Sequence, residues 1–208
     1  PWWDDVWLNE SFATWFADKI VGEVNPGLHP ERSQVESGLR AMSGDSLATT
    51  RRIREPVTTF TDIRSAFDGI TYSKGGAVLA MFERQLGADK FREGMRQYMA
   101  KHARGNATSN DLIEALAAVS KDPAEFRNAF RTFLDQPGVP LLQVRTQCDD
   151  GPPRLLIEQQ RYLPVGSTVA ASGDPARNTG EPLLVQPVTG TDWQVAYWPA
   201  PAAWQPST

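Results

Sequence analysis

A carboxylate stands inside an otherwise apolar and aromatic opening segment of this 208-residue chain, at Glu10. From Leu8 onward, large side chains recur at helical spacing, which predicts a stripe that packs into a core. The residues of that stripe are Leu8, Phe12, Trp15, Phe16 and Ile20. Glu10 lies off the stripe, on a helix face whose other members are small and leave room for another helix or a bound ion. Those neighbours, at i+3, i+4 and i+7, are Ala13, Thr14 and Ala17.

Two interpretations of Glu10 stay open on these residues alone. An unpaired buried carboxylate is costly, and a metal ion is one way to stabilise it, so Glu10 is a candidate metal ligand. A glutamate near a helix N-terminus is also a common surface residue, favoured by the helix macrodipole. For an arbitrary glutamate, the surface position is the more frequent one.

Tyr72 is the second candidate for chemistry, in the segment Ile70-Thr71-Tyr72-Ser73-Lys74-Gly75-Gly76. If Tyr72 lies in the first turn of a helix, its i+3 and i+4 neighbours are Gly75 and Gly76, which leave space beside the phenol. Two glycines weaken a helix interior by about 1 kcal/mol each relative to Ala, so close packing or access to a cavity is expected here. The alternative is a core tyrosine whose hydroxyl bonds to backbone, with glycines that serve helix contact.

The amino-acid sequences of both segments resemble those of one family. Residues 2–13, Trp-Trp-Asp-Asp-Val-Trp-Leu-Asn-Glu-Ser-Phe-Ala, resemble the segment that follows the zinc-binding H-E-x-x-H helix in the M1 family of zinc aminopeptidases, a gluzincin group. The resemblance implies that Glu10 is the third zinc ligand. Tyr-Ser-Lys-Gly resembles the Tyr-x-Lys-Gly element of the same family, which implies that the Tyr72 hydroxyl bonds the oxyanion of the tetrahedral intermediate.

Further similarities follow in family order over about residues 1–165. They are Arg54-Glu55-Pro56-Val57, the pair Phe67-Asp68, and the segment from Phe133 to Pro140. The last resembles the family's Trp-x-x-Gln-x-Gly-x-Pro, with two departures: Phe133 replaces the usual Trp, and Pro137 is an unusual neighbour for the Gln. A shared order of several motifs is far more specific than either motif alone.

The resemblance implies an α+β fold. Residues 1–139 would be the helical part of a thermolysin-like catalytic domain, and residues 140–208 a small, truncated, sandwich-like antiparallel β domain. It also implies that the parent protein is a zinc metallopeptidase, most simply an aminopeptidase acting on peptides. A non-catalytic scaffold of the same family is the alternative function, although a scaffold has no reason to keep both Glu10 and Tyr72.

Other parts of the family's site are not in this sequence, so we expect it to be a piece of a longer protein. It contains no H-E-x-x-H and no Gly-x-Met-Glu-Asn, and both would lie upstream of Pro1. The two histidines, His29 and His102, match no family ligand and are expected to be ordinary solvent-facing residues. One carboxylate without imidazole partners is a weak zinc site, so we expect the chain alone to be inactive.

Composition excludes several classes of partner. The net charge is −4 and no Lys/Arg run occurs, which argues against nucleic acid or a membrane surface as an electrostatic partner. No apolar run is long enough to span a bilayer. The single cysteine, Cys148, excludes an intramolecular disulfide and a multi-Cys zinc site. The sequence gives no compartment.

The elements expected from periodicity and turn signals divide the chain near Gln136. Thr108, with Asp111 three residues later, predicts a capped helix start, and Asp122 followed by Pro123 predicts another. Helical patterns cover about 7–22, 70–87, 88–103, 109–120 and 123–135, and a further helix between 23 and 69 carries Val35, Leu39 and Met42. Strands are expected at Leu141–Cys148, Leu155–Tyr162, Leu183–Val188 and Val195–Trp198, with a hairpin turn at 149–153 and a long loop at 164–182.

Overall fold

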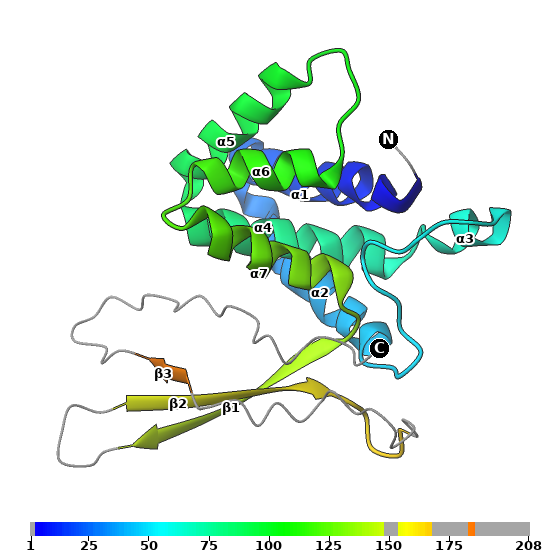
Figure 1. Cartoon of the computed structure of the whole chain (residues 1–208), viewed down its shortest axis with the longest axis vertical. Coiled ribbons are helices and arrows are strands. Elements are labelled where there is room, and N and C mark those ends of the chain that lie inside the picture. The colour runs from blue at the N-terminus through cyan, green and yellow to red at the C-terminus, as the bar shows by residue number, and fades with distance from the viewer. Residues whose placement is uncertain (1–2, 148–153, 168–182, 186–208) are drawn as a thin grey trace.

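The chain has an α+β fold in which a group of helices precedes a small antiparallel sheet (Figure 1). A computed structural model describes residues 3–147, 154–167 and 183–185. Its helices are α1 (Val6–Val24), α2 (Pro30–Asp45), α3 (Phe60–Ser65), α4 (Gly75–Leu86), α5 (Ala88–Lys101), α6 (Ser109–Ala118) and α7 (Pro123–Asp135). Short 3-10 turns occupy Trp3–Asp5 and Pro26–Leu28, and a π-helical turn, η3, occupies Ile70–Lys74.

Side-chain caps fix where several helices begin. The predicted capping box of α6 is present: the Thr108 hydroxyl accepts from the Asp111 N–H, and the Asp111 carboxylate accepts from the Thr108 N–H. Asp122 caps α7 as expected, with Pro123 at its first position. A second capping box, Thr59 with Asp62, begins α3.

The core lies where α4, α6 and α7 meet α1. Phe82 of α4 stacks on Phe130 of α7 with ring centroids 4.2 Å apart, and Leu116 of α6 is fully buried. These positions recur at helical spacing on each element, so each helix buries one stripe. Burial of such side chains is the main favourable contribution to folding, at roughly 1.5–3 kcal/mol each.

The stripe predicted for α1 is only half correct. Leu8 and Trp15 are buried, but Phe16 is 45% exposed and Ile20 is 41% exposed, whereas Trp7 is completely buried. Because α1 carries large apolar residues on most of its circumference, periodicity alone could not select the buried face. The expected helix with Val35, Leu39 and Met42 exists as α2, although all three side chains are exposed.

The predicted continuous helix over 70–87 is wrong at its start. Ile70–Lys74 form the π turn η3, and regular α-helix begins only at Gly75. A π turn is rare and often marks a functional site, and hydrophobic periodicity does not distinguish it from α-helix.

The strands β1 (Val139–Gln147), β2 (Arg154–Tyr162) and β3 (Leu183–Val185) form an antiparallel sheet in the order β1-β2-β3. Val139 pairs with Tyr162 and Gln147 with Arg154, as the predicted hairpin requires. The turn at 149–153, Cys148, the strand at 195–198 and most of the 164–182 loop lie outside the described residues. A sandwich and a two-domain division at 139 remain predictions.

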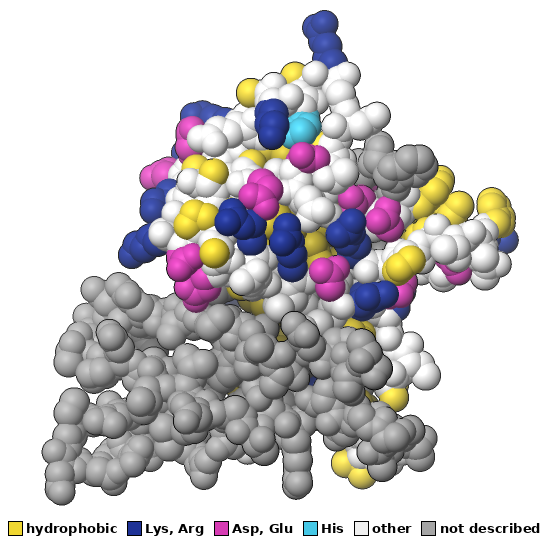
Figure 2. All heavy atoms as spheres, viewed as in Figure 1, with side chains coloured by type: hydrophobic (Ala, Val, Ile, Leu, Met, Phe, Trp, Pro, Cys, Tyr) yellow, Lys and Arg dark blue, Asp and Glu magenta, His cyan; other side chains and the backbone are white. Residues whose placement is uncertain are grey.

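Charge is mixed on the visible surface of the helical part. In Figure 2, Lys/Arg and Asp/Glu side chains alternate over the face shown. Within the described ranges, no helix is both long and apolar enough to cross a membrane.

Candidate active site

Glu10 lies in the second turn of α1, half-buried, with its carboxylate near the surface. The Asn9 amide donates a hydrogen bond to Glu10 Oε1 at 3.0 Å. On the same face Ala13 and Ala17 are exposed, so the small-residue face predicted beside Glu10 is open in this chain. The carboxylate is therefore oriented from its own helix and accessible to further groups.

Tyr72 lies in the π turn η3, which contacts α1. Desolvation raises the pKa of the Tyr72 phenol, and a hydrogen bond to the Glu10 side chain and its negative charge raise that pKa further. The Glu10 carboxylate and the Tyr72 phenol, the two groups singled out from sequence, are therefore near enough to interact electrostatically.

Gly75 allows the close approach that brings these segments together. The Ser11 hydroxyl of α1 donates to the Thr71 carbonyl of η3 at 2.6 Å, in a buried contact 60 residues apart in sequence. A Cβ built on Gly75 would lie 2.0 Å from Ser11 Oγ, so any side chain there collides. At Gly76 the nearest atom, Thr14 Cγ2, is 3.6 Å away, an ordinary contact.

A buried ion pair fixes the end of η3. Lys74 Nζ lies 2.7 Å from Asp45 Oδ2 at the end of α2, and the side chains are only 14% and 3% exposed. Asp45 Oδ1 also accepts from the Gly138 N–H at 3.0 Å, just before β1. Burial lowers the pKa of Lys74, and the Asp45 carboxylate opposes that shift. Lys74 therefore ties the tyrosine segment to α2 and to the first strand.

The Asp-Asp pair before α1 anchors the glutamate helix, which sequence reasoning missed. Asp5 is 4% exposed and accepts from the Ser109 N–H at 3.0 Å and from its hydroxyl at 2.5 Å. Arg54 Nε lies 3.4 Å from Asp5, and Arg54 also pairs with Asp4. An acidic pair followed much later by an arginine was the only available signal.

The two histidines differ from each other. His29 is 53% exposed and pairs with Glu31, as expected for a surface residue. The expectation is wrong for His102, whose side chain is 18% exposed, with its ring 5.4 Å from Tyr98 and Nε2 3.6 Å from Asp111. The capping carboxylate of α6 and a flat aromatic neighbour cover it.

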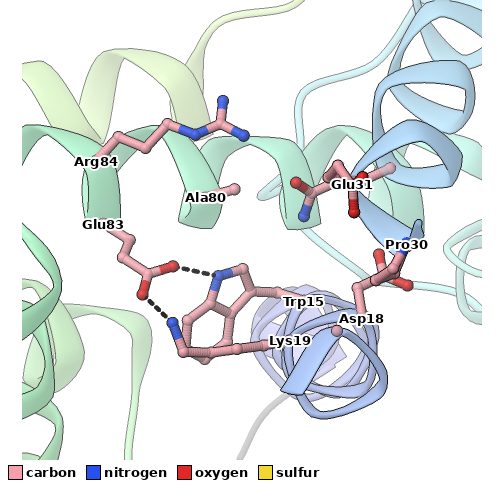
Figure 3. Close-up of a pocket in the computed structure, with 10 residues that line it drawn as sticks. Trp15, Asp18, Lys19, Pro30, Glu31, Ala80, Glu83 and Arg84 are labelled. Atoms are coloured by element: carbon pink, nitrogen blue, oxygen red, sulfur yellow. Dashed lines mark hydrogen bonds and ion pairs between the residues drawn. The ribbon is translucent and has the colours of Figure 1, made fainter. Parts of the chain in front are cut away.

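A pocket not foreseen from sequence lies between α1, the start of α2 and α4 (Figure 3). Glu83 accepts from the Trp15 indole N–H at 3.0 Å and from Lys19, and both bonds are drawn in Figure 3. The pocket lining includes neither Glu10 nor Tyr72. It is therefore separate from the candidate site.

Comparison with known proteins identifies the family. The sequence profile described as the Peptidase family M1 domain matches residues 1–134. The chain belongs to this family. Aminopeptidase 2, mitochondrial, of Saccharomyces cerevisiae is 36% identical over 163 residues, 78% of this chain and 17% of that protein.

Two further relatives in the family carry aminopeptidase names. Leucyl aminopeptidase of Saccharolobus solfataricus is 30% identical over 80% of this chain and 20% of its own length. Glutamyl aminopeptidase of Sus scrofa is 33% identical over 93% of this chain and 18% of its own length. The chain therefore spans about a fifth of the length of the curated relatives it matches.

Zinc is the metal that the family implies, and Glu10 fits it as one donor. A half-buried carboxylate held by Asn9 is a suitable oxygen ligand. In the part of the chain that the structure describes, no cluster of three or more His, Cys, Asp or Glu side chains could hold a metal ion. The described residues thus supply part of a zinc site at most.

Proposed function

We propose that the whole protein is a zinc-dependent aminopeptidase that hydrolyses N-terminal peptide bonds. Glu10 is one zinc ligand in this proposal, and Tyr72 donates a hydrogen bond to the oxyanion. The packing of η3 against α1 carries the proposal, because the 2.6 Å hydrogen bond from the Ser11 hydroxyl to the Thr71 carbonyl joins the immediate neighbours of Glu10 and Tyr72. Membership of family M1 and the aminopeptidase names of the relatives support it.

Each residue has a defined part. When bound, zinc supplies a polarised water and Lewis-acid stabilisation of the carbonyl oxygen. Glu10 presents a carboxylate that its neighbour Asn9 orients, as outer hydrogen bonds commonly orient metal ligands. A phenol keeps its proton at neutral pH, so the Tyr72 hydroxyl is a donor where negative charge develops.

The chain by itself is proposed neither to hold zinc tightly nor to cleave peptides. Its described residues offer Glu10 without imidazole partners, and a single carboxylate is a weak zinc site. One tightly held zinc per chain after dialysis, or cleavage of an aminoacyl reporter by the chain alone, would contradict this.

The decisive test is Tyr72→Phe in the whole protein. Removing an oxyanion donor lowers kcat by about 100- to 1,000-fold in comparable sites, whereas KM changes little. Tyr162→Phe, the same chemical change at an exposed position on β2, is the matched control and should leave kcat within about twofold.

Two results separate the alternatives. An unchanged kcat in Tyr72→Phe removes the role assigned to the hydroxyl. A whole protein that holds no zinc and cleaves no aminoacyl reporter would be the non-catalytic scaffold.

A further inference from the structure

The backbone that carries Tyr72 does not hold itself in place. Its π turn has five residues, Ile70–Lys74, and the residue just before it, Gly69, has no side chain to cap it. The first N–H groups of a helical turn lack partners within the turn, so they need acceptors from outside. The direction in which Tyr72 leaves the turn therefore depends on the groups that hold this start.

Asp68 supplies the missing acceptors. Its Oδ1 accepts from the Ile70 N–H at 2.9 Å and from the Thr71 N–H at 3.1 Å. Its carbonyl accepts from the Tyr72 N–H at 3.0 Å. Asp68 therefore binds three successive N–H groups and determines where the turn begins.

Arg51, from the loop after α2, holds Asp68 and the turn together. Its Nη2 lies 2.5 Å from Asp68 Oδ1 and its Nε 3.2 Å from Asp68 Oδ2, a two-pronged pairing that fixes direction. The same Nη2 donates to the Thr71 hydroxyl at 2.8 Å and to the Ala66 carbonyl at 3.2 Å. The remaining guanidinium nitrogen, Nη1, donates to the Arg52 carbonyl at 2.9 Å.

Burial shows what this arrangement contributes. The Arg51 side chain is 20% exposed and that of Asp68 is 43% exposed, so the pair adds little to global stability. Thr71, in contrast, is completely buried and precedes Tyr72 directly. The Arg51 guanidinium, which contacts Asp68 and Thr71, therefore acts mainly on the orientation of the turn.

We infer that Arg51 is a positioning residue for Tyr72, acting through Asp68 and Thr71 to aim the phenol at the reacting carbonyl. The inference rests on the proposed function of Tyr72. An error of about 1 Å in the placement of a reacting group can cost on the order of 100-fold in rate, which gives the arginine a measurable effect without substrate contact.

The test is a double-mutant cycle in the whole protein, with zinc content measured for each variant. Arg51→Met should lower kcat by about tenfold or more with KM and zinc content nearly unchanged. In a Tyr72→Phe background the same change should cost no further kcat, because the group that Arg51 positions is gone. Arg51→Lys should restore only part of the kcat lost in Arg51→Met, since one ammonium cannot reproduce the two-pronged pairing with Asp68.

Arg52→Met is the matched control. Arg52 is the adjacent arginine and makes a comparable two-pronged pair with Glu55. Arg52→Met therefore removes the same charge from the same loop as Arg51→Met does. Its kcat should stay within about twofold of wild type. If Arg51→Met does not fold, Asp68→Asn is a milder break that keeps one acceptor for the turn.

The outcomes separate the two claims. Equal losses of kcat in both backgrounds, or an equal loss in Arg52→Met, would overturn the positioning role. If Tyr72→Phe itself leaves kcat unchanged, the proposed role of the Tyr72 hydroxyl fails, and fluorotyrosine at position 72 then decides whether Arg51 orients the ring. Its ¹⁹F signal should shift in Arg51→Met and not in Arg52→Met, and an unshifted signal would overturn the inference.

Discussion

The helix that carries Glu10 and the turn that carries Tyr72 hold their functional side chains in opposite ways. Glu10 lies on α1, a regular 19-residue helix. Once the buried face of that helix is fixed, the position of Glu10 along the helix determines where its side chain points. Tyr72 lies on a five-residue π turn. Its contacts come from outside the turn: Arg51 and Asp68 before it, Asp45 at the end of α2, and Ser11 on α1.

The difference teaches where the site is vulnerable. A long helix distributes its stability over many backbone bonds, so single surface contacts on α1 are replaceable. The π turn depends on a few charged and closely packed contacts, and each of them is made by one particular set of residues. We therefore expect substitutions around Tyr72 to cost more than chemically matched substitutions around Glu10.

The largest effect is expected for Lys74→Met. It leaves the Asp45 carboxylate, 3% exposed, without its cation, which typically costs about 3 kcal/mol or more. Lys19→Met is the matched change on α1, where the Lys19 and Glu83 side chains are 33% and 16% exposed, and should cost about 1 kcal/mol or less. Urea unfolding of the chain measures both, and equal losses would remove the asymmetry between the two regions.

Gly75→Ala should come next, with a loss of about 2 kcal/mol, because its Cβ would lie 2.0 Å from Ser11 Oγ. Gly76→Ala is the control on the same helix. Its Cβ meets Thr14 at 3.6 Å, and the gain in helix propensity should stabilise the chain by up to about 1 kcal/mol. Opposite signs in thermal unfolding are expected, and a harmless Gly75→Ala would show that α1 and η3 can separate at no cost.

The smallest effect is expected near the helix that carries Glu10. The start of α6, which Thr108 and Asp111 cap, holds Asp5 just before α1 through Ser109. Asp111→Asn should cost about 1 kcal/mol at pH 7. Hydrogen bonds from Thr108 hold the pKa of Asp111 below its usual 3.8. Its contribution is therefore complete above that value and is lost as the pH falls through the lowered pKa.

Urea unfolding of wild type and variant across the acid range measures this dependence. The difference in free energy of unfolding between them should shrink toward zero at low pH. A difference that stays constant with pH would mean that the charge of Asp111 contributes nothing to the cap.

By itself the sequence determined the family, the main helices and the two candidate residues. Capping boxes and Pro/Gly turns act within a few residues, so Thr108 with Asp111 and Pro123 after Asp122 placed α6 and α7 correctly. Short contiguous sequence motifs that resemble those of the family contain Glu10 and Tyr72, so both residues could be singled out from sequence alone. Their chemical roles remain proposals that need the rest of the protein.

Only the tertiary structure decided how those residues are held. The π turn, the buried face of α1 and the covering of His102 all depend on partners far along the chain, which periodicity does not report. The same holds for Arg51 and Asp68, ordinary charged residues in sequence. Their importance comes from a hydrogen-bond geometry that exists only once the loop after α2 has packed against the tyrosine segment.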